Sequence, residues 1–374
     1  MVSRSVKLLL ALAFSVFLTL GSFSSFGQEE HAAPVAGEKK EEFNAGKTII
    51  HHVLDSHEFH FFNIGEHAYA IHLPIIMYSP ERGVSVFSSG KFEEGKVAYG
   101  GYKLDEETNK IVAVKEDGSV DETVKAYDFS LTKNVVQMLI GAILLIVIML
   151  NVAKKYKTTG ATQAPSGFQN AIEPVITFVR DDVAKPNLHG KHDRYLPFLL
   201  SVFFFILINN ILGLIPGSAN VTGNIAFTAV LAVISLIVIL FSTNGHFWGH
   251  IFWPPGVPFL VKLILIPVEL LGVFIKPAAL MIRLFANMTA GHIVILSFVS
   301  LIFIFGQMST VAGWGFSPVS LAFSVFIYMI EILVAFIQAF IFTNLTAVFI
   351  GQAFEAGHAH DDHDPHHHGE EIFV

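Results

Sequence analysis

The sequence predicts an all-α polytopic membrane protein with about five membrane helices in its mature form, two of them long and strongly tilted, and a small N-terminal extracytoplasmic domain that contains β-strands. Of its 374 residues, 53% are hydrophobic and only 14% are charged, against about 25% charged residues in soluble domains. The mean hydropathy is +0.58, and long apolar tracts follow residue 131. One water-soluble core cannot bury so many apolar side chains, so a membrane is the expected environment.

The composition also excludes several classes of function. The formal net charge is −8, which does not suit a nucleic-acid-binding protein. The chain has no cysteine, so disulfides, thiolate metal sites and cysteine nucleophiles are excluded. It also lacks the glycine-rich loop with a following lysine that cradles nucleotide phosphates. We therefore expect no cofactor, no resident metal and no nucleic-acid partner.

Residues 1–27 have the pattern of a secretory signal peptide. Arg4 and Lys7 form a short basic region before an apolar stretch that is short for a membrane span. Small residues, Ser25 and Gly27, then stand at the −3 and −1 positions of a cleavage site. Cleavage would leave the new N-terminus outside the cytoplasm. The alternative is an uncleaved first membrane span.

Residues 28–130 form the polar part of the chain. Residues 28–46 are rich in Glu, Lys, Ala and Gly, which is typical of a flexible leader. Beyond them, segments of alternating hydrophobicity are separated by turn residues and predict strands at residues 69–78, 84–87, 97–104 and 111–114. We expect a small antiparallel β domain outside the membrane, and its sequence indicates no chemistry.

Histidines occur in two groups that resemble metal sites. The first group contains His51, His52, His57 and His60. His57 and His60 are one residue short of the i, i+4 spacing that a helical zinc motif needs, so hydrogen-bonded or solvated histidines are favoured. The second group lies in the C-terminal tail, residues 356–374, where six histidines and three aspartates could collect a divalent metal. A solvated cytoplasmic tail is the favoured interpretation.

The membrane domain is expected over residues 131–355. Three apolar segments there have the length of a single span: residues 134–152, 196–214 and 224–242. Seven Lys or Arg lie between residues 154 and 195, which places this loop in the cytoplasm. Five apolar residues of the loop share one helical face: Ile172, Val175, Ile176, Val179 and Val183. This helix either lies on the membrane surface or packs against the protein itself.

Two further apolar tracts are too long for an upright membrane helix. Residues 257–305 would reach about 73 Å as one helix, whereas the hydrocarbon core of a bilayer is about 30 Å thick. The second tract covers residues 319–350. These helices must therefore be strongly tilted, lie nearly in the membrane plane, or break near Pro267, Gly272 or Pro277. Two oblique helices would present a curved surface to another membrane component.

The polar residues of the first long tract are candidates for function, because ionisable groups in a bilayer are costly. Glu269, Lys276 and Arg283 are spaced by seven residues and share one helical face. Asn287 is four residues beyond Arg283 and extends that face, whereas His292 is nine residues beyond it and points to the opposite side. Snorkelling to the lipid headgroups is the favoured role for Lys276.

The second long tract adds a carboxylate. Glu331 and Gln338 are seven residues apart on one helical face. Arginine stays protonated, so Arg283 can hold or repel charge, whereas His292 and Glu331 can exchange protons. A static hydrogen bond between the last two is the alternative. Two adjacent amides of the second span are expected mainly to join helices: Asn209 and Asn210.

These residues lie in motifs that resemble those of subunit a of F-type ATP synthases. The match is most specific at Met281–His292, with the sequence MIRLFANMTAGH and with Lys276-Pro277 just before it. Shorter matching segments are Asn209–Pro216, Pro267–Leu270 and Gln338–Leu345. The resemblance covers roughly residues 131–351, and the extended N-terminal region with its signal peptide is similar to the form found in Bacteroidetes-type bacteria.

The resemblance implies a non-catalytic stator subunit of the bacterial inner membrane, with its N-terminal domain in the periplasm and its C-terminus in the cytoplasm. It would pass protons through two half-channels to a rotating ring of c subunits, beside peripheral-stalk subunit b and, indirectly, the catalytic ATPase sector. Arg283 would face the ring, with Gln338 near it. His292, Glu331 and Asn287 would line one half-channel. The order of acid and histidine along the chain is exchanged relative to some bacterial members.

Two rival classes remain at the level of the sequence. A stand-alone secondary transporter or ion channel often contains inverted repeats with paired broken helices, but the arginine segment has no second copy in this chain. An intramembrane protease would need a serine–histidine pair or a zinc motif, and we recognise neither. Copurification of a ring-forming small subunit and a peripheral ATPase would distinguish the stator from both rivals.

Overall fold

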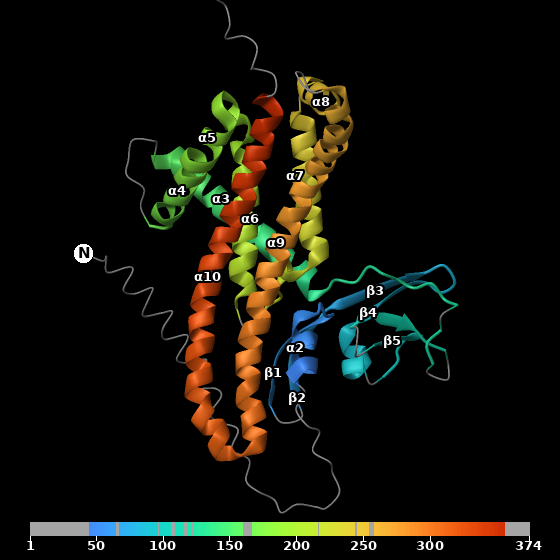
Figure 1. Cartoon of the computed structure of the whole chain (residues 1–374). Coiled ribbons are helices and arrows are strands. Elements are labelled where there is room, and N and C mark those ends of the chain that lie inside the picture. Colours follow the sequence, from blue (N-terminus) through green and yellow to red (C-terminus); the bar gives the residue numbers. More distant parts are fainter. Residues whose placement is uncertain are drawn as a thin grey trace, which may run out of the picture. The chain divides into compact units, whose positions relative to one another are not determined.

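The computed structural model describes most of residues 45–355. The breaks in this range are residues 65–66, 96, 106–108, 116–118, 122, 160–166, 216, 244 and 254–257. The predicted signal peptide, most of the predicted leader and the histidine-rich tail lie outside the described residues, as do the side chains of His51, His52 and His60. In the described part, a strand-containing N-terminal region precedes a set of long helices (Figure 1), which confirms the predicted fold class.

The described part of the N-terminal region contains one α-helix, a short 3-10 helix and short antiparallel sheets. Helix α2 (Ala45–Val53) precedes β1 (Glu58–Ile64) and β2 (His67–His72), which pair with each other. The central sheet has the order β4-β3-β7, and its strands are β3 (Pro74–Ser79), β4 (Gly83–Ser88) and β7 (Tyr127–Asp128). The third sheet pairs β5 (Tyr102–Leu104) with β6 (Ile111–Ala113).

A small apolar core stabilises this region. Alternate residues of β3, Ile75 and Met77, are fully buried against Phe92 and Tyr102. Because side chains alternate across a strand, Pro74, Ile76 and Tyr78 point to the other face of the sheet. Phe92 belongs to the short helix η2 (Ser89–Gly95), which follows β4.

Two of the predicted strands are wrong in extent. The segment predicted at residues 69–78 is divided at Leu73 between β2 and β3, which belong to different sheets. Pro74 lacks a backbone N–H and starts β3, a position that proline tolerates. The segment predicted at residues 97–104 turns at Gly100 and Gly101, whose φ angles of 62° and 79° form a tight turn, and only its end is a strand.

Five helices of the described chain are long and apolar enough to cross a membrane. They are α3 (Lys133–Thr159), α6 (His192–Gly213), α7 (Ile225–Ser242), α9 (Phe259–Met308) and α10 (Thr310–Glu355). This confirms the predicted number of mature spans. Shorter helices lie between them: α4 (Phe168–Phe178), a π turn at Val179–Ala184, α5 (Lys185–Leu188), η4 (His189–Lys191), η5 (Val221–Gly223) and α8 (Gly245–Phe252).

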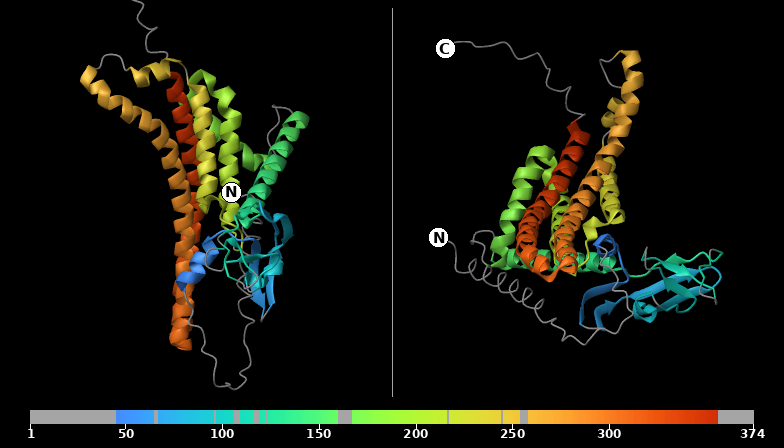
Figure 2. Two further views of the ribbon diagram at one scale, coloured as in Figure 1. Left: turned by 90° about the vertical axis from the view of Figure 1, so that its right-hand side faces the viewer. Right: turned by 60° about the horizontal axis from the view of Figure 1, so that its bottom comes forward.

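The two longest helices form an antiparallel hairpin (Figure 1). Helix α9 has 50 residues and α10 has 46, so each is about 70 Å long, more than twice the hydrocarbon core of a bilayer. Pro267 and Pro277 lie inside α9 without ending it, so the predicted alternative of a broken helix is wrong. Instead α9 is continuous and curved, as the left view of Figure 2 shows.

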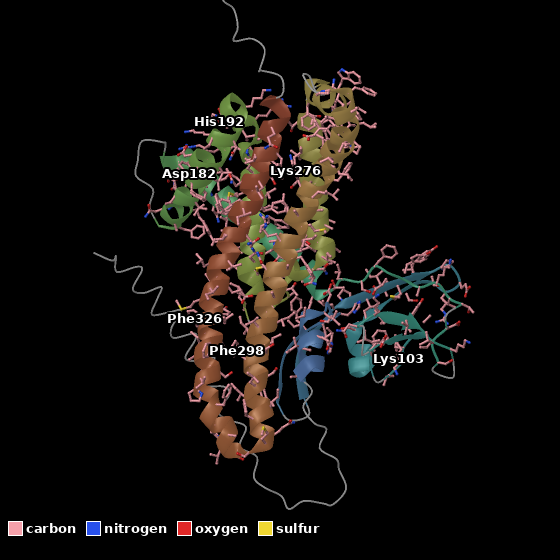
Figure 3. The ribbon with its side chains drawn as sticks, viewed as in Figure 1. Lys103, Asp182, His192, Lys276, Phe298 and Phe326 are labelled. Carbon is pink, nitrogen blue, oxygen red and sulfur yellow. The ribbon has the colours of Figure 1, made fainter. Side chains whose placement is uncertain are left out.

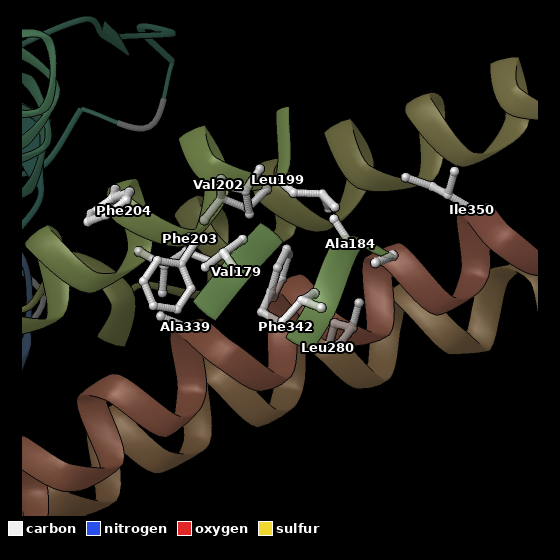
Figure 4. Packing of buried hydrophobic residues seen from close by; sticks show 14 of the residues in the cluster. Val179, Ala184, Leu199, Val202, Phe203, Phe204, Leu280, Ala339, Phe342 and Ile350 are labelled. Carbon is white, nitrogen blue, oxygen red and sulfur yellow. The ribbon is translucent and has the colours of Figure 1, made fainter. Parts of the chain in front are cut away.

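A buried apolar cluster joins the π turn to α6, α9 and α10 (Figure 4). Its central members are Val179, Ala184, Leu199, Val202, Phe203, Phe204, Leu280, Ala339, Phe342 and Ile350. Ile172, Val175 and Ile176 of α4 pack against the same cluster. The amphipathic segment predicted in the cytoplasmic loop therefore packs against the protein, which was one of its two predicted arrangements.

Candidate functional site: an acid–histidine pair between two long helices

A histidine and a glutamate face each other across the hairpin of α9 and α10. His292 Nε2 lies 3.9 Å from Glu331 Oε1, which is within ion-pair range but longer than a hydrogen bond. Glu331 is only 3% exposed, and neither carboxylate oxygen has a hydrogen-bond partner in the described part of the chain. A buried carboxylate without hydrogen bonds is costly. The site is therefore suited to accept a proton or a water molecule.

A glycine makes room for this carboxylate. A Cβ atom added at Gly291, the residue before His292, would collide with Oε1 of Glu331. Every residue except glycine carries a Cβ atom, so the two helices can bring the acid this close only with glycine at this position. The sequence contains Gly291 within its most specific motif, but only the structure shows what the residue does.

The opposite face of α9 carries the permanent charge. Arg283 and Asn287 are exposed, whereas Leu284 and Met288, on the other side of the helix, are buried. Within the described residues, the guanidinium of Arg283 has neither an ion pair nor a hydrogen bond. Glu269 is also exposed on this face. The structure thus separates Arg283 from the acid–histidine pair, as the helical spacing predicts.

Lys276 contacts the other long helix. Its Nζ donates a hydrogen bond to Gln352 Oε1 at 3.1 Å and lies 5.0 Å from the centre of the Phe349 ring. Figure 3 shows Lys276 toward one end of the hairpin, with Phe298 and Phe326 closer to the turn between α9 and α10. The ammonium therefore joins α9 to α10, a contact that the snorkelling interpretation did not include.

The asparagine pair of α6 faces two neighbours. Asn210 Nδ2 donates to the Ala335 carbonyl of α10 at 3.0 Å, which ties these helices together four residues from Glu331. Asn209 Nδ2 donates to Phe205 O within its own helix at 2.8 Å. Asn209 also packs on α3 at Gly141, where an added Cβ would lie 2.9 Å from its amide. Gln338 is 6% exposed, on the same helix as Glu331.

Sequence reasoning missed three polar residues around the connection between α6 and α7. Tyr328 Oη donates to Leu214 O at 2.8 Å, and Asn220 Nδ2 donates to Met288 O at 3.3 Å. Gln137 of α3 bonds both backbone groups of Ala219. Tyr328 could have been predicted from the sequence, because it lies three residues before Glu331 on the same helical face. Gln137 is distant in sequence from every motif, and Asn220, four residues after the Asn209–Pro216 segment, has no spacing that relates it to the pair.

The N-terminal histidine that resembled a metal ligand has a different partner. His57 Nε2 lies 3.0 Å from Asp128 Oδ2, and the described residues contain no group of three or more side chains that could hold a metal ion. Burial acts to raise the pKa of the Asp128 carboxyl, but hydrogen bonds from His57 and Ser130 outweigh it and lower the pKa below its usual value.

The fold and the site define a multi-pass membrane protein with a polar pair between two long oblique helices and an arginine on their outer face. Residues 135–351 match the family described as ATP synthase A chain, and residues 48–130 match a domain of unknown function. The chain therefore belongs to the ATP synthase A chain family, as the motif resemblance indicated.

Several curated relatives agree with this assignment. The chain is 41% identical over 325 residues to ATP synthase subunit a of Chloroherpeton thalassium, a match that covers 86% of this chain and 79% of that protein. It is 35% identical to ATP synthase subunit a 2 of Chlorobaculum tepidum, with 96% of each chain covered. The corresponding protein of Myxococcus xanthus is 41% identical over 247 residues, which are 64% of this chain and 78% of that protein.

Proposed function

We propose that this chain is the proton-conducting stator subunit of an ATP synthase membrane sector. The observation that carries the proposal is the division of α9 into two faces. One face brings His292 within 3.9 Å of the buried carboxylate of Glu331. The other face exposes Arg283, whose guanidinium has no partner in the described part of the chain. The first face suits proton exchange, and the second suits a charged group on another subunit.

The mechanism follows from these two faces. A proton enters from outside near Glu331 and His292, whose side chains titrate, and neutralises a carboxylate on a helix of the rotating ring. The neutral site can then face lipid. After almost a full turn it reaches a second half-channel and releases its proton inward. Arg283 stabilises the ionised carboxylate that returns, and its fixed charge blocks a direct leak between the half-channels.

This mechanism assigns the partners. The ring of c subunits faces Arg283, with Gln338 nearby on α10. Asn287, which the resemblance assigns to the half-channel of the pair, is exposed on the Arg283 face of α9. Peripheral-stalk subunit b and the catalytic ATPase sector belong to the same complex, and this chain has no catalytic role of its own. One charge that crosses 100 mV supplies about 2.3 kcal/mol, so several protons are needed for each ATP.

The proposed topology follows the charge distribution. Residues 1–27 act as a signal peptide, residues 28–130 form a periplasmic domain, residues 131–355 form the membrane domain and residues 356–374 form a cytoplasmic tail. A reporter enzyme fused after residue 60 should be active outside the cytoplasm, and one fused after residue 160 should be active inside it. The opposite pattern would overturn the assignment of sides.

Replacement of Arg283 tests the function. Arg283→Ala removes the charge that stabilises the ring carboxylate and separates the half-channels, so ATP synthesis should be abolished in an assembled complex. Arg283→Lys keeps a charge but lacks the planar guanidinium, and it should also fail or nearly fail. The measurement is ATP synthesis and acid-driven dye quenching in vesicles, with the assembled complex quantified.

A matched arginine provides the control. Arg180 Nε lies 2.9 Å from Asp181 Oδ1 in the π turn before α6, and Arg180→Ala should leave coupling intact. If Arg283→Ala assembles and synthesises ATP at the normal rate, the stator mechanism is wrong. Transport that continues in purified chain without ring or ATPase subunits would instead favour a stand-alone transporter or channel.

A further inference from the structure

The connection between α6 and α7, residues 214–224, is fixed to α3 by one buried amide. Gln137 Nε2 donates to the Ala219 carbonyl at 2.6 Å, and Gln137 Oε1 accepts the Ala219 N–H at 2.9 Å. Gln137 is 5% exposed and Ala219 is fully buried. An amide that bonds both backbone groups of one residue fixes the orientation of that residue as well as its position.

The same connection contacts both long helices beside the acid–histidine pair. Asn220 Nδ2 donates to Met288 O at 3.3 Å, and its Oδ1 accepts the Gly223 N–H at 2.9 Å. Met288 lies four residues, about one helical turn, before His292. On α10, Tyr328 donates to Leu214 O at 2.8 Å, three residues before Glu331. The connection is therefore bonded within about one turn of each member of the pair.

Helix α3 is in turn fixed at its start by the N-terminal region. The first N–H groups of a helix have no partner within that helix. The N–H of Lys133 donates to Ser56 O at 2.8 Å, and the N–H of Asn134 donates to Asp55 Oδ1 at 3.2 Å. Gln137 follows one turn later on the same helix. Residues that precede the strands thus complete the beginning of the helix that carries Gln137.

We propose that Gln137 and Asn220 are positioning residues for the acid–histidine pair, and that the N-terminal region acts on the pair through them. The proposal rests on the proton-conducting function above. The path runs from Asp55 to the start of α3, from Gln137 to the α6–α7 connection, and from Asn220 to α9 beside His292. The proposal gives the N-terminal region a role. It fixes the beginning of α3 and thereby, through the α6–α7 connection, the spacing between α9 and α10.

The first test removes both hydrogen bonds of Gln137 with little change in volume. Gln137→Met should lower ATP synthesis about 3- to 10-fold, because the lost hydrogen bonds no longer hold the buried connection in place. The half-maximal rate should move to a lower external pH, because a displaced pair loads protons less readily; the titratable side chains at the pair are His292, Glu331 and Tyr328. Thr158→Val is the matched control, since within the described residues the Thr158 hydroxyl donates only to carbonyls of α3 itself.

Assembly is measured with each variant, because a residue that only supports folding would change the amount of complex and leave the pH profile in place. Asn220→Ala provides a second variant on the other side of the connection. An assembled complex in which both variants keep the normal rate and pH profile would overturn the proposal. Loss of assembly in both variants would also overturn it, because the two residues would then serve folding. Neither of these two results bears on the proposed stator function, which Arg283→Ala tests separately.

The link to the N-terminal region is tested by a double-mutant cycle. Asp55→Ala removes the bond to the Asn134 N–H, and it should lower the rate and shift the pH profile in the direction of Gln137→Met. If the effect passes through Gln137, the double variant should be no worse than the stronger single variant. Additive effects, or no effect of Asp55→Ala, would overturn the role of the N-terminal region.

Discussion

Two histidine–carboxylate pairs of this protein, His57–Asp128 and His292–Glu331, differ in how their carboxylates are satisfied. In the N-terminal region, Asp128 Oδ2 lies 3.0 Å from His57 Nε2, and Oδ1 accepts the Ser130 N–H at 2.8 Å. Between the long helices, Glu331 is 3.9 Å from His292, and neither of its oxygens has a hydrogen bond within the described residues.

This difference separates a structural pair from a pair suited to proton exchange. Asp128 has its negative charge stabilised by its own neighbours, so it gains little from a further proton or partner. Glu331 is buried without such neighbours and therefore gains much from a proton or a bound water. The two pairs contain the same types of side chain, so residue type alone does not distinguish them. They are distinguished by the hydrogen bonds that each carboxylate accepts.

The largest effect expected from this comparison is that of Glu331→Gln. Glutamine has nearly the shape of glutamate but cannot take up and release the proton, so ATP synthesis and proton transport should fall on the order of 100-fold. The measurement is acid-driven dye quenching and ATP synthesis in vesicles with quantified complex. Asp128→Asn makes the same chemical change in the other pair and should leave both rates unchanged. Equal effects of the two variants, or none at Glu331, would reduce the membrane pair to packing.

A smaller effect is expected from Gly291→Ala. The added Cβ collides with the Glu331 carboxylate, so the acid must turn away from His292, and transport should fall several-fold. Alanine favours a helix over glycine by about 1 kcal/mol, so α9 itself should not be weakened. Gly306→Ala is the matched control, because nothing lies within 4 Å of a Cβ at that position of α9. A normal rate for Gly291→Ala in assembled complex would show that the close approach is unimportant.

The sequence predicts the membrane part well because its signals are long. All five spans extend over many apolar residues, and such a pattern has few alternative interpretations. The placement of Arg283 and His292 on opposite faces of α9 also follows from helical geometry alone. The continuity of α9 through Pro267 and Pro277 could not be predicted, because proline within a membrane helix is compatible with either a bend or a break.

The remaining features depend on contacts between distant segments. The short strands were misjudged where two glycines, Gly100 and Gly101, adopt positive φ angles and turn the chain. The contacts that Gln137 and Asn220 make across the fold could not be predicted, because the backbone groups that accept from their amides belong to a connection and a helix distant in sequence. His292 and Glu331 are separated by 38 residues, so the distance between their side chains likewise could not be predicted before the hairpin of α9 and α10 is known.

The smallest effect expected from the comparison concerns the stability of the N-terminal sheet. The pKa of Asp128 is lowered in the folded protein, so the stability it contributes is fully present above the pKa of the unfolded chain, near 4, and is lost as the pH falls through the folded value. Asp128→Asn removes the charge and should destabilise the sheet by no more than about 1 kcal/mol at neutral pH, since the carboxylate is partly exposed. Hydrogen exchange of the β3 amides measures this difference, which should disappear as the pH falls through the lowered pKa of Asp128. A difference that persists in acid would mean that the hydrogen bonds, and not the charge, stabilise this pair.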